Sequence, residues 1–303
     1  MDFADFTATF GSMSSDRIPG VKSRLLGVKL REVMANARHT GYSIAQCLRW
    51  DEPRVYRLLN GRRGGSARDV IQFMTACRRS PKEIEEMLRL CQGLTDPIWV
   101  NQYDRNLAVQ LRPLVMLETE AVEIRTLGHV VVPALLQTEA YMRALLGPAL
   151  NANAQVEARQ RRQQLLERSG AAELIAFLDE SVLRREVGGR RVMSEQLNRL
   201  LELQLRKNII IRVLPLALGG YPCHDHEFTL YETVTGRPTA HAWLLSSDVF
   251  IEDDREIHRY KQAVATLSAL ALSPADSGKL IATMAARFCP EPGAATPRRV
   301  AER

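Results

Sequence analysis

TGYSIAQCLRWDEPRVYRLLNG, residues 40–61, is the stretch that decides the fold of the N-terminal part of this chain. Its apolar residues recur at intervals of three and four, the spacing of one helix face, in two short runs separated by a turn. Ala45 is small, so two helices can cross closely beside it. The apolar contacts between them are expected from Ile44, Leu48, Val55 and Leu58. The stretch therefore predicts a helix-turn-helix.

The second of these helices has recognisable ends. Asp51 or Glu52 can cap its first turn, and Pro53 fits there because the first N–H groups of a helix have no partner within it. Asn60-Gly61 supplies residues that tolerate the left-handed conformation common just after a helix. The helix is therefore predicted to be short, from Glu52 to Asn60.

Three side chains on this short helix are candidates for reading DNA bases. Arg54 and Arg57 lie three residues apart and hence on one face, with Tyr56 beside them. An arginine can donate two parallel hydrogen bonds to O6 and N7 of guanine, worth about 1–3 kcal/mol of discrimination. Solvation or an intramolecular ion pair is the alternative for any one of these arginines.

A second group of side chains is expected to hold phosphates, which fixes the register on DNA without reading its sequence. Arg62 and Arg63 follow the short helix in a loop, where long basic side chains can reach the backbone of the duplex. The full set of predicted phosphate contacts is Tyr42, Ser43, Asn60, Arg62 and Arg63.

The positive charge of the chain is concentrated around this motif. The whole sequence has a formal net charge of +6. Residues 21–65 contain ten basic side chains against three acidic ones, a net charge of +7, so the other residues together carry −1. A basic block in a foldable segment is typical of proteins with a polyanionic partner, and double-stranded DNA is the partner predicted here. A solvated basic face is the alternative.

Helical spacing continues on both sides of the motif, from residue 25 to residue 92. Ser66 is expected to cap a fourth helix and Ser80-Pro81 to open a fifth. Beyond residue 93 the pattern becomes mixed. Strands are predicted at 122–126, 174–178, 209–214, 227–233 and 241–245, and helices at 138–146, 155–168, 193–206, 255–270 and 274–288. The predicted fold class is α+β, an all-α five-helix domain followed by a larger mixed α+β domain.

The predicted domain boundaries follow these changes in pattern. They are a flexible arm at 1–20, a helix-turn-helix DNA-binding domain at 21–93, an α+β regulatory or partner-binding domain at 94–289 and a flexible tail at 290–303. The sequence has no run of about 20 apolar residues, and its first residues lack a signal-peptide pattern. We therefore expect no membrane contact and a cytoplasmic, nucleoid-associated location.

The cysteines give no sign of a disulfide framework or a zinc finger. They are odd in number, widely spaced and without a C-x-x-C pair: Cys47, Cys77, Cys91, Cys223 and Cys289. We expect reduced and mostly buried thiols.

Two further polar clusters could carry chemistry. In the run from Cys223 to Glu227, His224 and His226 would point to one side of an extended chain, so they could bind a metal, line a ligand pocket or lie in a plain loop. No third ligand is evident, and we predict a candidate ligand pocket and no metal.

The second cluster is Asp179-Glu180 at the end of a predicted strand, with Arg184 close behind. Two carboxylates could act as acid and base, but no nucleophile, phosphate loop or triad accompanies them. The alternative is that Asp179 caps a turn while Glu180 pairs with Arg184. We predict no enzyme activity and no cofactor.

The N-terminal region resembles the xenobiotic-response-element class of phage-repressor-like helix-turn-helix domains. Three residues depart from that class. Arg49 stands at the turn position usually taken by glycine, and Gly41 and Leu59 replace a polar and an acidic residue. The resemblance implies the fold, while its contacts to DNA do not transfer directly.

The rest of the chain resembles an actinobacterial family of antitoxin-like transcription regulators, whose C-terminal domain was first defined without a function. The resemblance rests on VPALLQTEAY at 132–141, LDESVLRR at 178–185, the segment 196–215, FTL at 228–230 and LSP at 272–274. It implies a repressor or activator whose C-terminal domain binds a ligand or a small protein encoded by a neighbouring gene.

Together these features predict a sequence-specific transcription regulator with its short helix in the major groove. A homodimer is expected because one short helix offers few base contacts, and two-fold proteins read paired half-sites. The alternatives are an interaction protein that sequesters a small partner through its C-terminal domain, and a ligand-gated sensor.

Overall fold

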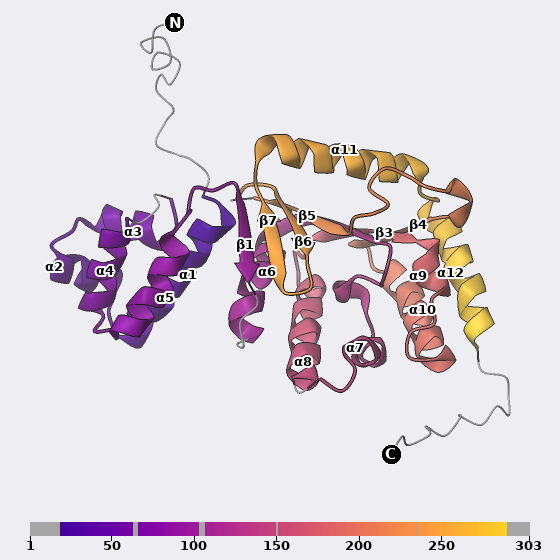
Figure 1. Ribbon diagram of the computed structural model, residues 1–303, viewed down its shortest axis with the longest axis horizontal. Coiled ribbons are helices and arrows are strands. Elements are labelled where there is room, and N and C mark those ends of the chain that lie inside the picture. Colours follow the sequence, from indigo (N-terminus) through magenta and orange to yellow (C-terminus); the bar gives the residue numbers. More distant parts are fainter. Residues whose placement is uncertain (1–18, 63–65, 103–106, 150, 235, 290–303) are drawn as a thin grey trace, which may run out of the picture. The chain divides into compact units, whose positions relative to one another are not determined.

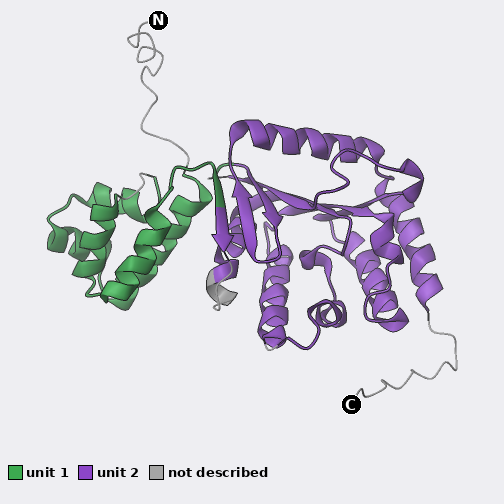
Figure 2. Cartoon of the chain, in the orientation of Figure 1, with its two compact units in different colours: residues 1–99, 235–237 green, residues 100–234, 238–303 purple. Residues whose placement is uncertain are grey.

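The structure is a computed structural model that describes residues 19–62, 66–102, 107–149, 151–234 and 236–289. The chain divides into two compact units, shown in separate colours in Figure 2. Unit 1 comprises residues 1–99 and 235–237, and unit 2 comprises residues 100–234 and 238–303. The predicted arm at 1–20 lies outside the described residues except for Pro19 and Gly20, as does the predicted tail at 290–303.

The described part of unit 1 contains five helices: α1 (Val21–Asn36), α2 (Gly41–Leu48), α3 (Glu52–Leu59), α4 (Ala67–Ala76) and α5 (Pro81–Cys91). Three of them begin with a capping box, in which Thr40, Ser66 or Ser80 accepts a hydrogen bond from the third helical N–H and the third side chain bonds back. The caps predicted at Ser66 and Ser80 are confirmed. All five helices contribute to one apolar core, which includes Leu30, Ile44, Val55, Phe73 and Met87.

The turn between α2 and α3 holds Arg49 in the left-handed conformation, with φ 54° and ψ 41°. That conformation costs a non-glycine residue about 1–2 kcal/mol. We expect Arg49→Gly to raise the free energy of unfolding by about 1 kcal/mol in urea titrations. The control Arg89→Gly, on the exposed side of α5, should lower it by about 1 kcal/mol because glycine is a poor helix former. If Arg49→Gly is less stable than the parent, the backbone at residue 49 is not strained.

Unit 2 is built on a mixed sheet, whose seven strands in the described residues follow the order β1-β7-β6-β5-β2-β3-β4. Strands β2, β3 and β4 run parallel to one another. The other pairs are antiparallel: β5 pairs with β2, β6 with β5, and β7 with β6. The bounds are β1 (Ile98–Gln102), β2 (Ala121–Gly128), β3 (Glu173–Asp179), β4 (Ile209–Leu214), β5 (Phe228–Thr233), β6 (Thr239–Trp243) and β7 (Ser247–Ile251).

Helices cover both faces of this sheet. They are α6 (Leu107–Glu120), α7 (Glu139–Leu146), α8 (Ala152–Gln163), α9 (Glu180–Arg184), α10 (Arg190–Gln204), α11 (Asp254–Leu270) and α12 (Pro274–Phe288). In Figure 1, α11 lies along one face, and α7, α8 and α10 lie on the other. The face below α11 is apolar and packs Leu127, Phe177, Leu230, Ile257 and Leu267 together. None of the described helices is long and apolar enough to cross a membrane.

The predicted α+β class is confirmed, and each of the five predicted strands is present with ends shifted by a few residues at most. Four of the described elements were not predicted: β1, β7, α6 and the short α9. β1 and β7 are five residues long and show no clear alternation of apolar and polar residue types, and α6 carries Pro113 in its interior, where proline normally ends a helix. These elements form because the surrounding sheet and helices supply their partners.

The expectation of mostly buried thiols is wrong. The five cysteines are free, but Cys77 is buried, Cys91 and Cys223 are half-buried, and Cys47 and Cys289 are exposed. Cys47 is exposed because the inner face of α2 is taken by Ile44 and Ala45. Burial raises the pKa of the Cys91 thiol to about 11, so that thiol stays protonated and unreactive at neutral pH.

Candidate functional site

Helix α3 buries one face in the core of unit 1 and leaves the other in solvent. It runs from Glu52 to Leu59, with Pro53 in the first turn and Asp51 at the N-cap position, where, contrary to the predicted cap, its side chain makes no capping hydrogen bond. The buried residues are Val55, Leu58 and Leu59. Of the candidates for base reading, Arg54 and Tyr56 are exposed and Arg57 is half-buried. The exposed side of α3 is therefore polar and basic.

Arg54 is held in place by two neighbours that sequence reasoning did not connect to it. Its Nη2 atom donates to Asp69 Oδ1 at 2.6 Å, and its guanidinium lies 4.2 Å from the ring centroid of Trp50. The intramolecular ion pair considered from the sequence is therefore present. The capping box places Asp69 in the first turn of α4, but its pairing with α3 becomes visible only in the folded chain.

The charge state of Asp69 favours this arrangement. Burial opposes ionisation of the carboxyl, but hydrogen bonds from Arg54 and Ser66 outweigh it and hold the pKa of Asp69 below its ordinary value. Asp69 is therefore ionised at neutral pH. The side chain of Arg54 is still 46% exposed, and base reading by Arg54 stays a prediction.

The predicted phosphate contact Asn60 has a structural role at the end of α3. Its Nδ2 atom donates to the carbonyl oxygen of Tyr56 at 2.9 Å, and its Oδ1 atom accepts from Arg31 at 3.3 Å. Arg31 also donates to the carbonyl oxygen of Leu59. These bonds satisfy carbonyl groups at the helix end and tie α1 to α3.

The other predicted phosphate contacts differ in availability. Tyr42 is 57% exposed, and its hydroxyl accepts from Gln46 at 2.5 Å. Ser43 is engaged in the capping box, where its hydroxyl accepts from the N–H of Thr40 at 2.9 Å and donates to the Thr40 carbonyl at 3.1 Å. Arg62 is exposed just after α3, and Arg63 lies outside the described residues.

Part of the basic block stabilises unit 1 itself. Lys22 donates to the carbonyl oxygen of Gln92, and Arg24 is only 7% exposed. Lys22, and Arg31 through its bond to the end of α3, therefore link α1 to other parts of the unit. The positive charge available to a polyanion is therefore concentrated on exposed residues around α2 and α3, namely Arg38, Arg49, Arg54 and Arg62.

The expectation that the chain around His224 and His226 is extended is wrong. Residues 222–225 form a turn, with Cys223 at φ 64°, so the alternation of an extended strand does not apply. His224 stacks on Tyr221 with 4.5 Å between ring centroids, and His226 lies beside Asp225 on the surface. A ligand pocket at these two histidines stays a prediction. In the described residues, no group of three or more His, Cys, Asp or Glu side chains could hold a metal ion.

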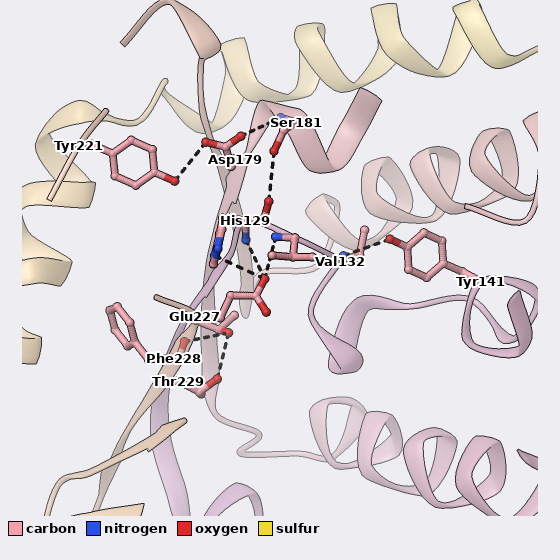
Figure 3. A network of polar contacts seen from close by, with 11 residues as sticks. His129, Val132, Tyr141, Asp179, Ser181, Tyr221, Glu227, Phe228 and Thr229 are labelled. Carbon is pink, nitrogen blue, oxygen red and sulfur yellow. Dashed lines mark hydrogen bonds and ion pairs between the residues drawn. The ribbon is translucent and has the colours of Figure 1, made fainter. Parts of the chain in front are cut away.

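Near this turn, a polar network joins the ends of the parallel strands (Figure 3). Glu227 Oε1 accepts from the backbone N–H groups of His129 and Val130 at 2.9 and 2.8 Å. Ser181 Oγ donates to the carbonyl oxygen of His129 at 3.1 Å. The network thus fixes the segment that follows β2 against α9 and the start of β5.

The sequence-based interpretation of Asp179-Glu180 is confirmed. Asp179 accepts from the N–H of Ser181 at 2.8 Å and caps α9, and Glu180 pairs with Arg184 at 2.5 Å. Asp179 also accepts from the Tyr221 hydroxyl at 3.1 Å. Burial, followed by the charge of Asp179, raises the pKa of Tyr221. The carboxylates are engaged in local structure.

The packed helix pair and the polar, basic outer side of α3 define a DNA-binding regulator of the helix-turn-helix class. Residues 25–87 match a family model described as a helix-turn-helix domain. Residues 111–283 match a second model, described as a domain of unknown function, DUF5753. Because that match covers more than half of the sequence, the chain belongs to the DUF5753 family.

Among solved structures, the chain is similar to TrmBL2, an archaeal chromatin protein whose structure is described as showing a novel mode of DNA binding. The two are 14% identical, the match covers 77% of this chain and 87% of that chain, and the TM-score is 0.29. A TM-score this low does not allow their elements to be compared. No curated protein matches the chain.

Proposed function

We propose that this protein is a sequence-specific transcription regulator that places α3 in the major groove of DNA. The observation that carries the proposal is the geometry of α3, which is fixed to the core through Val55 and Leu58 and presents Arg54, Tyr56 and Arg57 on its outer side. Bidentate bonds from arginine to guanine would supply the sequence preference.

The proposed regulator acts as a homodimer. Helix α3 has eight residues, so a single copy can contact only a few base pairs. A two-fold dimer presents two such helices to half-sites about 34–36 Å apart, which multiplies the number of specific contacts. A DNA site with two-fold symmetry would support this arrangement.

The C-terminal domain, residues 94–289, has the regulatory role in this proposal. The sequence resemblance to antitoxin-like regulators supports a small protein partner encoded by a neighbouring gene, a ligand, or both. The engagement of Asp179 and Glu180 in local structure supports a binding role without enzyme activity. The proposed location is the cytoplasm, on the nucleoid.

Arginine substitutions test the proposed reading of DNA. We expect Arg57→Ala or Arg54→Ala to weaken binding to the DNA upstream of the protein's own gene by about 1–3 kcal/mol while leaving a scrambled duplex unaffected. Arg62→Ala should weaken both duplexes equally and lower the slope of log K against log salt by about one. Fluorescence anisotropy at several salt concentrations measures both effects.

The matched control is Arg89→Ala, an exposed arginine of α5 that lies outside the proposed interface. It should bind both duplexes like the parent. If Arg54→Ala, Arg57→Ala and Arg62→Ala also bind like the parent, α3 does not read DNA. Capture of a small protein from native extract without any shift of the upstream DNA would favour the sequestering role.

A further inference from the structure

Unit 2 contains a partly open cavity of about 280 Å3 between its sheet and helices α6 and α8. Its floor is formed by side chains from strands β2, β5, β6 and β7. Thr126 lies opposite Thr229, and Thr229 lies opposite His241, so the three form one row across the sheet. Asp248 of β7 and Tyr231 of β5 share this face because side chains alternate along a strand.

This face differs from the other side of the same strands. Leu127, Phe228 and Ala240 are the sequence neighbours of the row residues, and they pack into the apolar core below α11. The cavity face instead holds hydroxyl and charged groups that are almost fully buried. Thr126, Thr229, His241 and Asp248 are each exposed by 6% or less. A buried sheet face is normally apolar, so these residue types require a reason other than packing.

The helices contribute a buried ion pair to the same cavity. Arg162 of α8 donates to Glu118 of α6 through Nε at 2.9 Å and Nη2 at 2.6 Å, and the two side chains are 10% and 1% exposed. On the floor, His241 Nε2 and Asp248 Oδ1 are 2.9 Å apart. Buried pairs of this kind are often no more stabilising than apolar side chains of similar volume.

A cavity that combines apolar walls with a few convergent polar groups is typical of a site for a small molecule. Here the buried polar groups gather around such a cavity, in a domain whose other sheet face packs normally. This coincidence is explained if the cavity receives a molecule that bonds to those groups.

We propose that this cavity binds a small, uncharged organic molecule with a ring-sized apolar body and hydroxyl or carbonyl groups. Two arginines, Arg159 and Arg162, and two carboxylates, Glu118 and Asp248, line it, so the formal charges of the lining cancel with His241 counted as neutral. A ligand with its own net charge would be buried without compensation. The cavity volume lies below the roughly 300–1,000 Å3 of pockets that bind larger ligands, so the ligand is expected to be small.

The remaining lining fits the same class of ligand. Leu111, Leu114 and Leu135 supply apolar walls, while Gln137 and the threonine row supply hydrogen-bonding groups. Trp243, which is 37% exposed, adds an aromatic wall that solvent reaches. The inference deepens the regulatory role proposed for residues 94–289 by naming the ligand class and its site.

Titration of the full chain with three probes of ten non-hydrogen atoms tests the proposal. We expect neutral 4-hydroxyacetophenone to bind with a millimolar Kd, about what a fragment of this size can reach, in ligand-observed NMR. Anionic 4-hydroxybenzoate and cationic tyramine should bind at least about fivefold more weakly because of uncompensated burial of charge. Tighter binding of either charged probe, or no binding of the neutral one, overturns the proposal.

Two variants locate the bound probe. Ala134→Trp fills the cavity and should weaken binding by more than about tenfold, and the isosteric Thr229→Val should weaken it about five- to tenfold by removing one hydroxyl. The control Thr266→Val, a half-buried threonine of α11 that does not line the cavity, should keep the parent Kd.

If Thr229→Val binds the neutral probe with the Kd of the parent, the proposal is overturned. The same holds if Ala134→Trp folds and binds the probe with the parent Kd. If Ala134→Trp does not fold, Thr229→Val decides. The probe titrations contain no DNA, so their failure is distinct from a failure of the arginine variants to change DNA binding.

Discussion

A chain carrying Gly27→Ala is expected to lose about 3 kcal/mol of unfolding free energy in unit 1, at the upper end of the overpacking range. A Cβ atom at residue 27 would overlap the carbonyl group of Leu59, where α1 crosses the end of α3. Both sides of this contact are backbone, so no change of rotamer relieves it. The end of α3 must move, and DNA binding should be lost together with stability.

The companion variant Gly61→Ala should behave similarly. Gly61 has φ +66°, and a Cβ atom there would lie 2.6 Å from the carbonyl oxygen of Ser23. Left-handed backbone and steric overlap therefore act at the same residue. Together, Gly27 and Gly61 let α1 approach the end of the proposed reading helix.

The matched control for both variants is Gly41→Ala. Gly41 begins α2, and an added Cβ atom there meets no atom within 4 Å. Because alanine favours the helix by about 0.8–1 kcal/mol over glycine, this variant should be as stable as the parent or more so. Urea unfolding followed by circular dichroism measures all three variants. A Gly27→Ala midpoint equal to that of the parent would show that α1 and α3 are not closely packed.

Glu118→Gln should have the second large effect, a loss of about 3–5 kcal/mol in the stability of unit 2. Arg162 would then remain buried and charged without its carboxylate. Burial alone would lower the pKa of Arg162, but Glu118 outweighs burial and raises it, so the guanidinium is charged in the folded state. Arginine does not escape the penalty by losing its proton.

A double variant separates the ion pair from the packing around it. Replacing both residues, as Glu118→Leu with Arg162→Met, removes the unpaired charge and should recover most of the stability lost in Glu118→Gln. The control Glu157→Gln breaks the exposed pair with Arg161 on the same helix α8 and should have little effect. If Glu118→Gln unfolds at the parent urea concentration, the buried pair is not formed.

Local signals are sufficient to predict the helices of unit 1. The periodicity around Ile44 and Val55, and the caps at Ser66 and Ser80, depend on residues within four positions of one another. Interactions between residues this close can be recognised from a short stretch of sequence. The end signals of α3 are of the same kind, which is why its predicted length differs from the observed one by a single residue.

The candidate sites were less predictable, because their contacts are long-range. The sequence predicts His224 and His226 on one side of an extended chain, but the left-handed Cys223 turns the chain there. Cys47 was expected inside the protein but lies outside, since the packing of α2 is decided by Ile44 and Ala45. Neither result follows from the composition of the segment alone.

The sequence by itself determined the helix-turn-helix, its basic charge and the α+β class, because these depend on residue type and on neighbours close in the chain. Only the tertiary structure decided that Asp69, 15 positions away, holds Arg54, and that Thr126 meets Thr229, 103 positions away. Strand pairing and helix crossing bring such residues together, and burial then gives their hydrogen bonds and charges their strength. The cavity of unit 2 likewise forms only when the strands and helices are packed together.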